Sequence, residues 1–123
     1  MNANRADAVA QEVTRQVLGQ LPPTLRVEAE ACRIEFCLAE DCRIDEPDLD
    51  EDLLGLFEGN SRLDPSPEHP DELPRIRLFL DNLWEHSEAD LATFREELRI
   101  TILHELGHYL GLDEEQVAAL GLE

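Results

Sequence analysis

Two histidines spaced four residues apart, in the segment HELGHYLG at 104–111, constrain this chain more than any other feature. On an α-helix, His104 and His108 lie one turn apart on the same face. Their imidazole nitrogens can then reach one metal ion at the distance that zinc prefers, about 2.0–2.1 Å. Glu105 would project beside such a metal, where its carboxylate could accept a proton from a water molecule that the metal binds. The segment therefore predicts a helix that carries a metal centre.

The surroundings of the histidine pair favour a helix packed against a core, because apolar residues precede and interleave it. These residues are Ile100, Ile102, Leu103 and Leu106. The motif leaves two alternatives open. The histidines could be solvated residues of a helix surface, or they could bind a metal without catalysis, which would not require Glu105 in its position.

The residues after the pair suggest a third ligand. Gly111 follows His104 by seven residues, where a left-handed residue would end the helix and turn the chain back toward the metal. The third ligand of such sites often lies about ten residues after the first histidine, which points to Glu114, with Asp113 as the alternative. Both acidic residues also suit the first turn of a final helix, where the helix dipole favours negative charge.

Length and charge limit the classes of protein that this chain can belong to. Residues 1–123 have the length of a single domain of ordinary size. The net charge of −19, from 29 acidic and 10 basic residues, repels phosphate backbones, so no nucleic-acid partner is expected. The sequence has no apolar run of membrane-spanning length and no signal-peptide pattern, so we expect a cytoplasmic protein without a membrane partner. The sequence leaves the oligomeric state open.

Three cysteines occur at a spacing of five residues, Cys32, Cys37 and Cys42. An odd number of cysteines in a reducing compartment predicts free thiols. Cys32 would share one face of a strand with apolar residues, so we expect it to be a small buried side chain.

Hydrophobic periodicity and turn residues predict the order of the elements. The first half is expected to contain a helix over 4–18, a short helix over 23–31, a strand over 33–38 and an acidic segment over 40–52. An apolar run over 53–57 follows as a candidate strand, and then a long loop over 61–74 and a strand over 75–80. A connector over 81–86 leads to the motif helix over 88–110, with Ser87 or Asp90 as its N-cap, and to a last helix over 113–120.

The sequence resembles those of the minimal zincins, a family of small bacterial zinc metallopeptidase-like proteins. The segment HExxHxxG with an acidic residue at position 114 carries the resemblance, and LLGLFEG at 53–59 is similar to the Leu-Gly-Leu-Tyr-Glu-Gly segment of that family. The resemblance extends from about Leu21 onward and includes the strand before the motif helix. It implies an α+β fold in which a small mixed sheet packs against a long metal-binding helix, with N-terminal and C-terminal helices.

Two residues depart from the family pattern. Glu114 stands where the family more usually has Asp, and Phe57 replaces a Tyr whose hydroxyl could have helped to polarise a substrate carbonyl. The source of oxyanion stabilisation beyond the metal therefore stays open.

The motif and the resemblance together predict zinc-dependent hydrolysis of a peptide or protein substrate. Glu105 is expected to be the catalytic base, and Zn2+ is expected to be bound by His104, His108 and Glu114, or Asp113 in place of Glu114. The strand over 75–80 is expected to be the sheet edge that pairs with an extended peptide.

Three further residues are assigned modest roles. Trp84 is expected to pack under the motif helix, and His69 and His86 are expected to lie in solvated loops.

Two rival functions remain. One is a non-catalytic, acidic interaction protein that binds zinc. The other is a metal-dependent endoribonuclease, a family that has a third histidine at the position of Glu114 and whose substrate the charge of −19 would repel.

Overall fold

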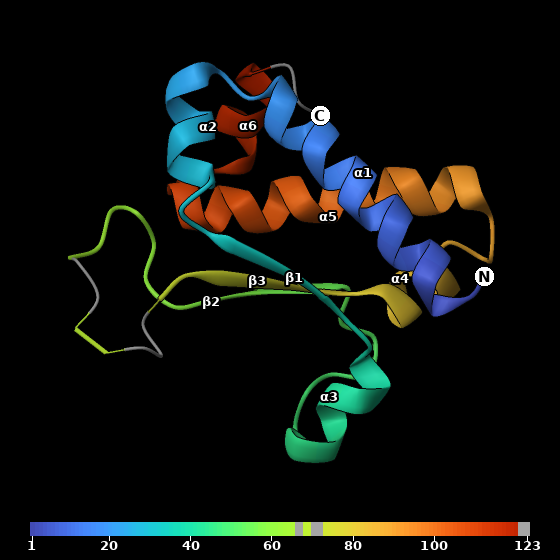
Figure 1. The fold of residues 1–123 in the computed structure, drawn as a ribbon. Helices are drawn as coiled ribbons and strands as arrows, with labels where there is room; N and C mark the ends of the chain where they lie inside the picture. Colours follow the sequence, from blue (N-terminus) through green and yellow to red (C-terminus); the bar gives the residue numbers. More distant parts are fainter. Residues whose placement is uncertain (66–67, 70–72, 121–123) are drawn as a thin grey trace.

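A computed structural model describes residues 1–65, 68–69 and 73–120 of the chain (Figure 1). The elements in these residues are α1 (Ala3–Gln20), α2 (Pro23–Ala29), β1 (Arg33–Cys37), α3 (Ala39–Asp45), β2 (Gly55–Glu58), β3 (Arg75–Phe79), α4 (Leu80–His86), α5 (Leu91–Leu110) and α6 (Glu114–Ala119). This arrangement confirms the predicted α+β class, with a small mixed sheet against a long helix. Parts of the predicted loop over 61–74, at 66–67 and 70–72, lie outside the described residues.

The sheet has the strand order β1-β3-β2, with β1 parallel to β3 and β2 antiparallel to it. The prediction that the strand over 75–80 is an edge is therefore wrong, because β3 is paired on both sides. An alternating sequence indicates which face of a strand is covered, but it says nothing about how many neighbours the backbone has. The two edge strands are β1 and β2, and β2 is the one that lies against α5.

The core lies between the sheet, α5 and α1, and α1 crosses α5 (Figure 1). Along α5, fully buried residues recur every four positions, at Phe94, Leu98, Ile102 and Leu106. This period brings one apolar stripe of the helix against its neighbours. Because α5 is fixed over its whole length, the side chains near its C-terminal end are held on a rigid support.

The motif helix begins later than predicted. Glu88 and Ala89 have positive φ angles, 54° and 58°, which are incompatible with a right-handed helix. Asp90 is the N-cap, and its carboxylate accepts a hydrogen bond from the Thr93 backbone N–H at 2.9 Å. The helix therefore starts at Leu91 rather than at residue 88.

Two short helices occupy segments to which the sequence analysis assigned no helix or strand: α3 lies within the acidic segment over 40–52, and α4 takes the place of the connector over 81–86. The N-terminus of α3 is capped by a residue of α4, because the Asp81 carboxylate accepts hydrogen bonds from the backbone N–H groups of Ala39 and Glu40 at 2.8 and 3.1 Å. A cap that comes from 42 residues away in the sequence has no local signal. The sequence therefore contains no indication of α3.

Several smaller predictions are confirmed. The Trp84 ring packs edge-on against Phe94 of α5, with ring centroids 5.4 Å apart. The three cysteines are free, and Cys32 is buried. Among the described residues, none of the helices combines the length and the apolar character needed to span a membrane.

Candidate metal centre

The histidine pair lies in the last two turns of α5, with both side chains exposed. The Nε2 atoms of His104 and His108 are 3.3 Å apart, and the two rings are perpendicular. Two nitrogens that each lie about 2.0–2.1 Å from a tetrahedral zinc ion would be roughly 3.3–3.4 Å apart. The spacing of the two donor atoms therefore matches the spacing that one metal ion requires.

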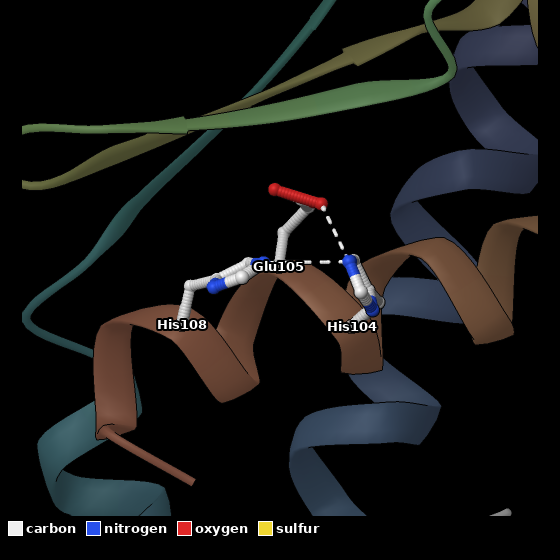
Figure 2. A group of neighbouring side chains, drawn as sticks. All are labelled: His104, Glu105 and His108. Atoms are coloured by element: carbon white, nitrogen blue, oxygen red, sulfur yellow. Dashed lines mark hydrogen bonds and ion pairs between the residues drawn. The ribbon is translucent and has the colours of Figure 1, made fainter. Parts of the chain in front are cut away.

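The Glu105 carboxylate is held beside this pair and is largely buried, with 9% of the residue exposed. It points from the helix toward the strands (Figure 2). Its Oε1 atom accepts a hydrogen bond from the Phe57 backbone N–H at 3.0 Å, and its Oε2 atom lies 3.8 Å from His104 Nε2. One oxygen is thus anchored on β2, while the other faces the place where the two imidazoles converge.

The anchor on β2 depends on the edge position of this strand. The Phe57 N–H points away from β3, and Gly55, two residues earlier, presents its backbone groups in the same direction. A Cβ atom on Gly55 would lie 2.7 Å from Thr101 Cγ2 and 3.4 Å from Glu105 Cγ. Only a residue without a side chain lets the strand approach α5 so closely. The glycine segment that resembles the family pattern thus has a structural role, which its sequence alone did not reveal.

The C-terminal end of α5 is closed by Gly111, as predicted. Its φ of 73° is left-handed, and its backbone N–H bonds back to the last turn of the helix. Arg62 satisfies two carbonyl groups of the same turn, because its backbone N–H donates to Tyr109 O at 2.8 Å and its Nε donates to Leu110 O at 2.6 Å. Arg62 was missed in the sequence, where it is one basic residue of a long loop.

The two candidates for the third ligand lie at the start of α6. Asp113 is its N-cap and forms a capping box with Gln116, in which the Asp113 carboxylate accepts a hydrogen bond from the Gln116 backbone N–H at 2.8 Å. Glu114 is the first residue of the helix. Within the described residues, the potential ligand atoms that lie within 4.8 Å of one another belong to His104, Glu105 and His108. Ligation by Glu114 or Asp113 stays a prediction, and the capping role of Asp113 favours Glu114.

The other two histidines lie outside this group. His69 is exposed. His86 ends α4 rather than lying in a loop, and its Nε2 is 3.6 Å from a carboxylate oxygen of Glu97.

A cavity of about 710 Å³ opens beside the histidine pair, between α5 and α6. Both His104 and His108 line it, together with both candidate third ligands. The rest of the lining comes from α5, from the segment that joins it to α6, and from α6, and consists of Glu96, Arg99, Ile100, Leu103, Gly107, Leu112 and Val117.

A comparison of the sequence with known protein families gives a result that agrees with the fold and with this site. Residues 30–122 match the family described as zincin-like metallopeptidase, and this match covers well over half of the chain. The chain therefore belongs to the zincin-like metallopeptidase family, which confirms the predicted resemblance and implies a metal centre, usually of zinc. A search of curated proteins found no match.

Proposed function

We propose that this protein hydrolyses peptide bonds with a zinc ion bound by His104 and His108 and by Glu114 as third ligand. The observation that carries the proposal is the spacing of the two Nε2 atoms, 3.3 Å, with the Glu105 Oε2 atom 3.8 Å from one of them. The two imidazole nitrogens can both bind a metal ion. The Glu105 carboxylate lies beside them, and it is not required as a ligand.

Bound zinc would polarise a substrate carbonyl and lower the pKa of a water molecule toward about 7. Glu105 would accept the proton that this water loses and deliver it to the nitrogen of the leaving amine. The hydrogen bond from the Phe57 N–H keeps the carboxylate in one orientation throughout. The side chain at position 57 provides no hydroxyl, so we assign carbonyl polarisation to the metal alone.

The substrate backbone would lie along the free edge of β2, rather than along β3 as the sequence suggested. Extended peptides bind sheet edges through main-chain hydrogen bonds. The outward N–H of Phe57 is used by Glu105, which leaves the Phe57 carbonyl and the two backbone groups of Gly55 to face a peptide. The partner is therefore an extended peptide segment, and the net charge of −19 makes a nucleic acid a poor alternative.

The proposal is tested by zinc content and by hydrolysis of a fluorescence-quenched library of unstructured peptides. We expect about one zinc per chain, and we expect His104→Ala and His108→Ala to abolish zinc binding, because each removes one of few ligands. His69→Ala is the matched control, since this exposed histidine lies outside the group and should leave the zinc content unchanged.

The role of Glu105 is tested in the same assay. Glu105→Gln should retain zinc but lose hydrolysis by about 10²–10⁴-fold, because the amide cannot accept the proton. Glu85→Gln, an exposed glutamate on α4, should match the wild-type rate. Full hydrolysis by the Glu105→Gln variant would show that this carboxylate is not the base.

A further inference from the structure

We propose that Cys37 and Cys42 are a modification site, at which a low-molecular-weight disulfide oxidises the two thiols to a disulfide bond within the chain. The two residues lie on either side of the junction between β1 and α3, because Cys37 ends the strand and Cys42 belongs to the helix. In Figure 1, β1 runs directly into α3, which lies beyond one end of the sheet. The inference goes beyond the proposed function, since neither residue belongs to the metal centre.

The backbone at this junction brings the two side chains together. Leu38 is the N-cap of α3, so Cys37 directly precedes the cap and Cys42 is the fourth residue of the helix. Side chains at these two positions pack against each other across the first turn, as in a hydrophobic staple. The first turn is formed here, because the Cys42 backbone N–H donates to Leu38 O at 3.1 Å. The cap from Asp81 on α4 holds the same turn in place.

The thiols of the two residues are neighbours in the structure. Burial, and after it the Cys42 side chain, raise the pKa of Cys37 to about 12. The Cys37 thiol also faces the Leu78 carbonyl group of β3, with Sγ 3.7 Å from the oxygen. Both cysteines are half-buried, so a part of each remains accessible from solvent.

The third cysteine lies too far away to take part. Cys32 directly precedes β1, so the length of the strand, about 16 Å for five residues, separates it from Cys37. A disulfide requires Cα atoms that are less than about 7 Å apart. Cys32 is also buried, and it therefore serves as an internal control for oxidation at the other two positions.

Two neighbouring thiols can form a disulfide, or they can contribute to a metal site. A structural zinc site requires four protein ligands. Among the residues that the structure describes, the group that could hold a metal contains neither cysteine. Oxidation needs only the two thiols, so it is the chemistry that this pair supports.

Glutathione disulfide is the probe, and the reaction proceeds by two exchange steps. Cys42 supplies the first thiolate, because a pKa of about 12 keeps the Cys37 thiol protonated near neutral pH. Its attack breaks the S–S bond of the probe, forms a mixed disulfide at Cys42 and releases one glutathione thiolate. Cys37 then loses its proton to solvent and attacks the Cys42 sulfur, and the second glutathione thiolate leaves. Each leaving thiolate takes up a proton, so two protein thiols are oxidised and one glutathione disulfide is reduced to two glutathione thiols.

The experiment equilibrates the reduced protein with mixtures of reduced and oxidised glutathione, alkylates the remaining thiols after an acid quench, and measures tryptic peptides by mass spectrometry. Cleavage after Arg26, Arg33 and Arg43 places Cys32 in the peptide 27–33 and the other two cysteines in the peptide 34–43. We expect the peptide 34–43 to be unalkylated and lighter by two hydrogen atoms. The peptide 27–33 should be alkylated throughout.

The same equilibrium in urea shows whether the fold brings the thiols together. We expect the equilibrium constant for the disulfide to be about 10- to 100-fold larger in the native protein, because a disulfide that fits the native state is less favourable in the unfolded chain. Equal constants in the two conditions would overturn the proposal.

Three variants assign the two steps. Cys37→Ser should accumulate the mixed disulfide at Cys42, and Cys42→Ser should leave Cys37 unmodified. Cys32→Ser is the matched control and should form the disulfide as the wild type does. A mixed disulfide that persists in the wild-type protein, or a disulfide that joins two chains, would contradict the assignment of these thiols as a pair.

Discussion

Gly111 ends α5 in a conformation that residues with a side chain rarely adopt, since its φ is 73°. A Cβ atom there would also overlap the Leu63 side chain. The two effects differ in weight, because Leu63 is 69% exposed and can move, whereas the φ angle is imposed by the end of the helix. The backbone conformation therefore decides the cost of a substitution.

We expect Gly111→Ala to lower the free energy of unfolding by about 1–2 kcal/mol, the cost of a left-handed conformation for a residue with a side chain. Urea denaturation provides the measurement. Gly19→Ala is the matched control, because nothing lies within 4 Å of the added methyl group and the residue is inside α1. That variant should be more stable than wild type by up to about 1 kcal/mol. Equal effects of the two substitutions would contradict the assignment of the left-handed cap.

At this scale, the sequence predicted what depends on local geometry. The left-handed residue at Gly111 and the histidines on one helix face follow from spacings of a few residues, whereas the choice between Ser87 and Asp90 as N-cap was left open. The contact of Leu63 with Gly111 and the hydrogen bond from Phe57 to Glu105 could not be predicted, because each joins residues 48 apart.

The strand β3 links α3, which lies in the acidic segment over 40–52, to the sheet. Its Ile76 and Leu78 are fully buried in the hydrophobic core, while Arg77 points to the opposite face. Arg77 is only 5% exposed, and its guanidinium bonds to both oxygens of Glu46 at 2.6 and 3.0 Å and to Glu58 at 2.7 Å. Through these bonds, the C-cap residue of α3 and the edge strand β2 are both attached to β3.

This network should depend on pH. The hydrogen bond from Arg77 holds the pKa of Glu46 below its ordinary value of about 4.3. A carboxyl group with a lowered pKa in the folded state contributes stability above its ordinary pKa, and this contribution is lost as the pH falls through the lowered value. The contribution of the pair is therefore complete at pH 7 and decreases in acid.

We expect Arg77→Met to lower the free energy of unfolding by about 1–3 kcal/mol at pH 7, the range for hydrogen bonds to charged groups. The difference from wild type should shrink as the pH is lowered through the lowered pKa of Glu46 in the folded protein, because the carboxylate is then protonated. Arg33→Met serves as control, because the side chain of Arg33 is 69% exposed and its ion pair with Glu35 should contribute little. A difference that does not change as the pH is lowered would exclude an ionic role for Arg77.

On the scale of the whole molecule, the core does not include the two histidines that we propose as metal ligands. The buried residues come from α1, the sheet, α4 and the apolar stripe of α5, whereas His104 and His108 are exposed. The C-terminal end of α5 is closed by Gly111 and Arg62 through protein groups. The contacts that assemble the core therefore do not involve these two histidines, which is what the proposal of a catalytic zinc, and not a structural one, requires.

Removal of zinc by EDTA should therefore leave the helical circular dichroism unchanged and the thermal transition cooperative. The melting temperature should fall only because zinc binding no longer contributes to the free energy of unfolding. This contribution is about 2.7 kcal/mol at a zinc concentration 100 times the dissociation constant. Loss of helical signal in EDTA, with recovery after zinc is restored, would instead support the rival reading of a structural zinc protein. His104→Ala, measured without EDTA, provides an independent metal-free sample.

The sequence by itself determined the helices and strands that have a regular spacing of apolar residues. It also determined the histidine pair with its neighbouring glutamate, because a spacing of four residues sets the geometry on any helix. Only the tertiary structure decided which strand is central, which residue caps α3 and which backbone group orients Glu105. The cap of α3 and the hydrogen bond to Glu105 join residues 42 and 48 positions apart. They are selected by the packing of complete elements on one another, and local periodicity contains no information about that packing.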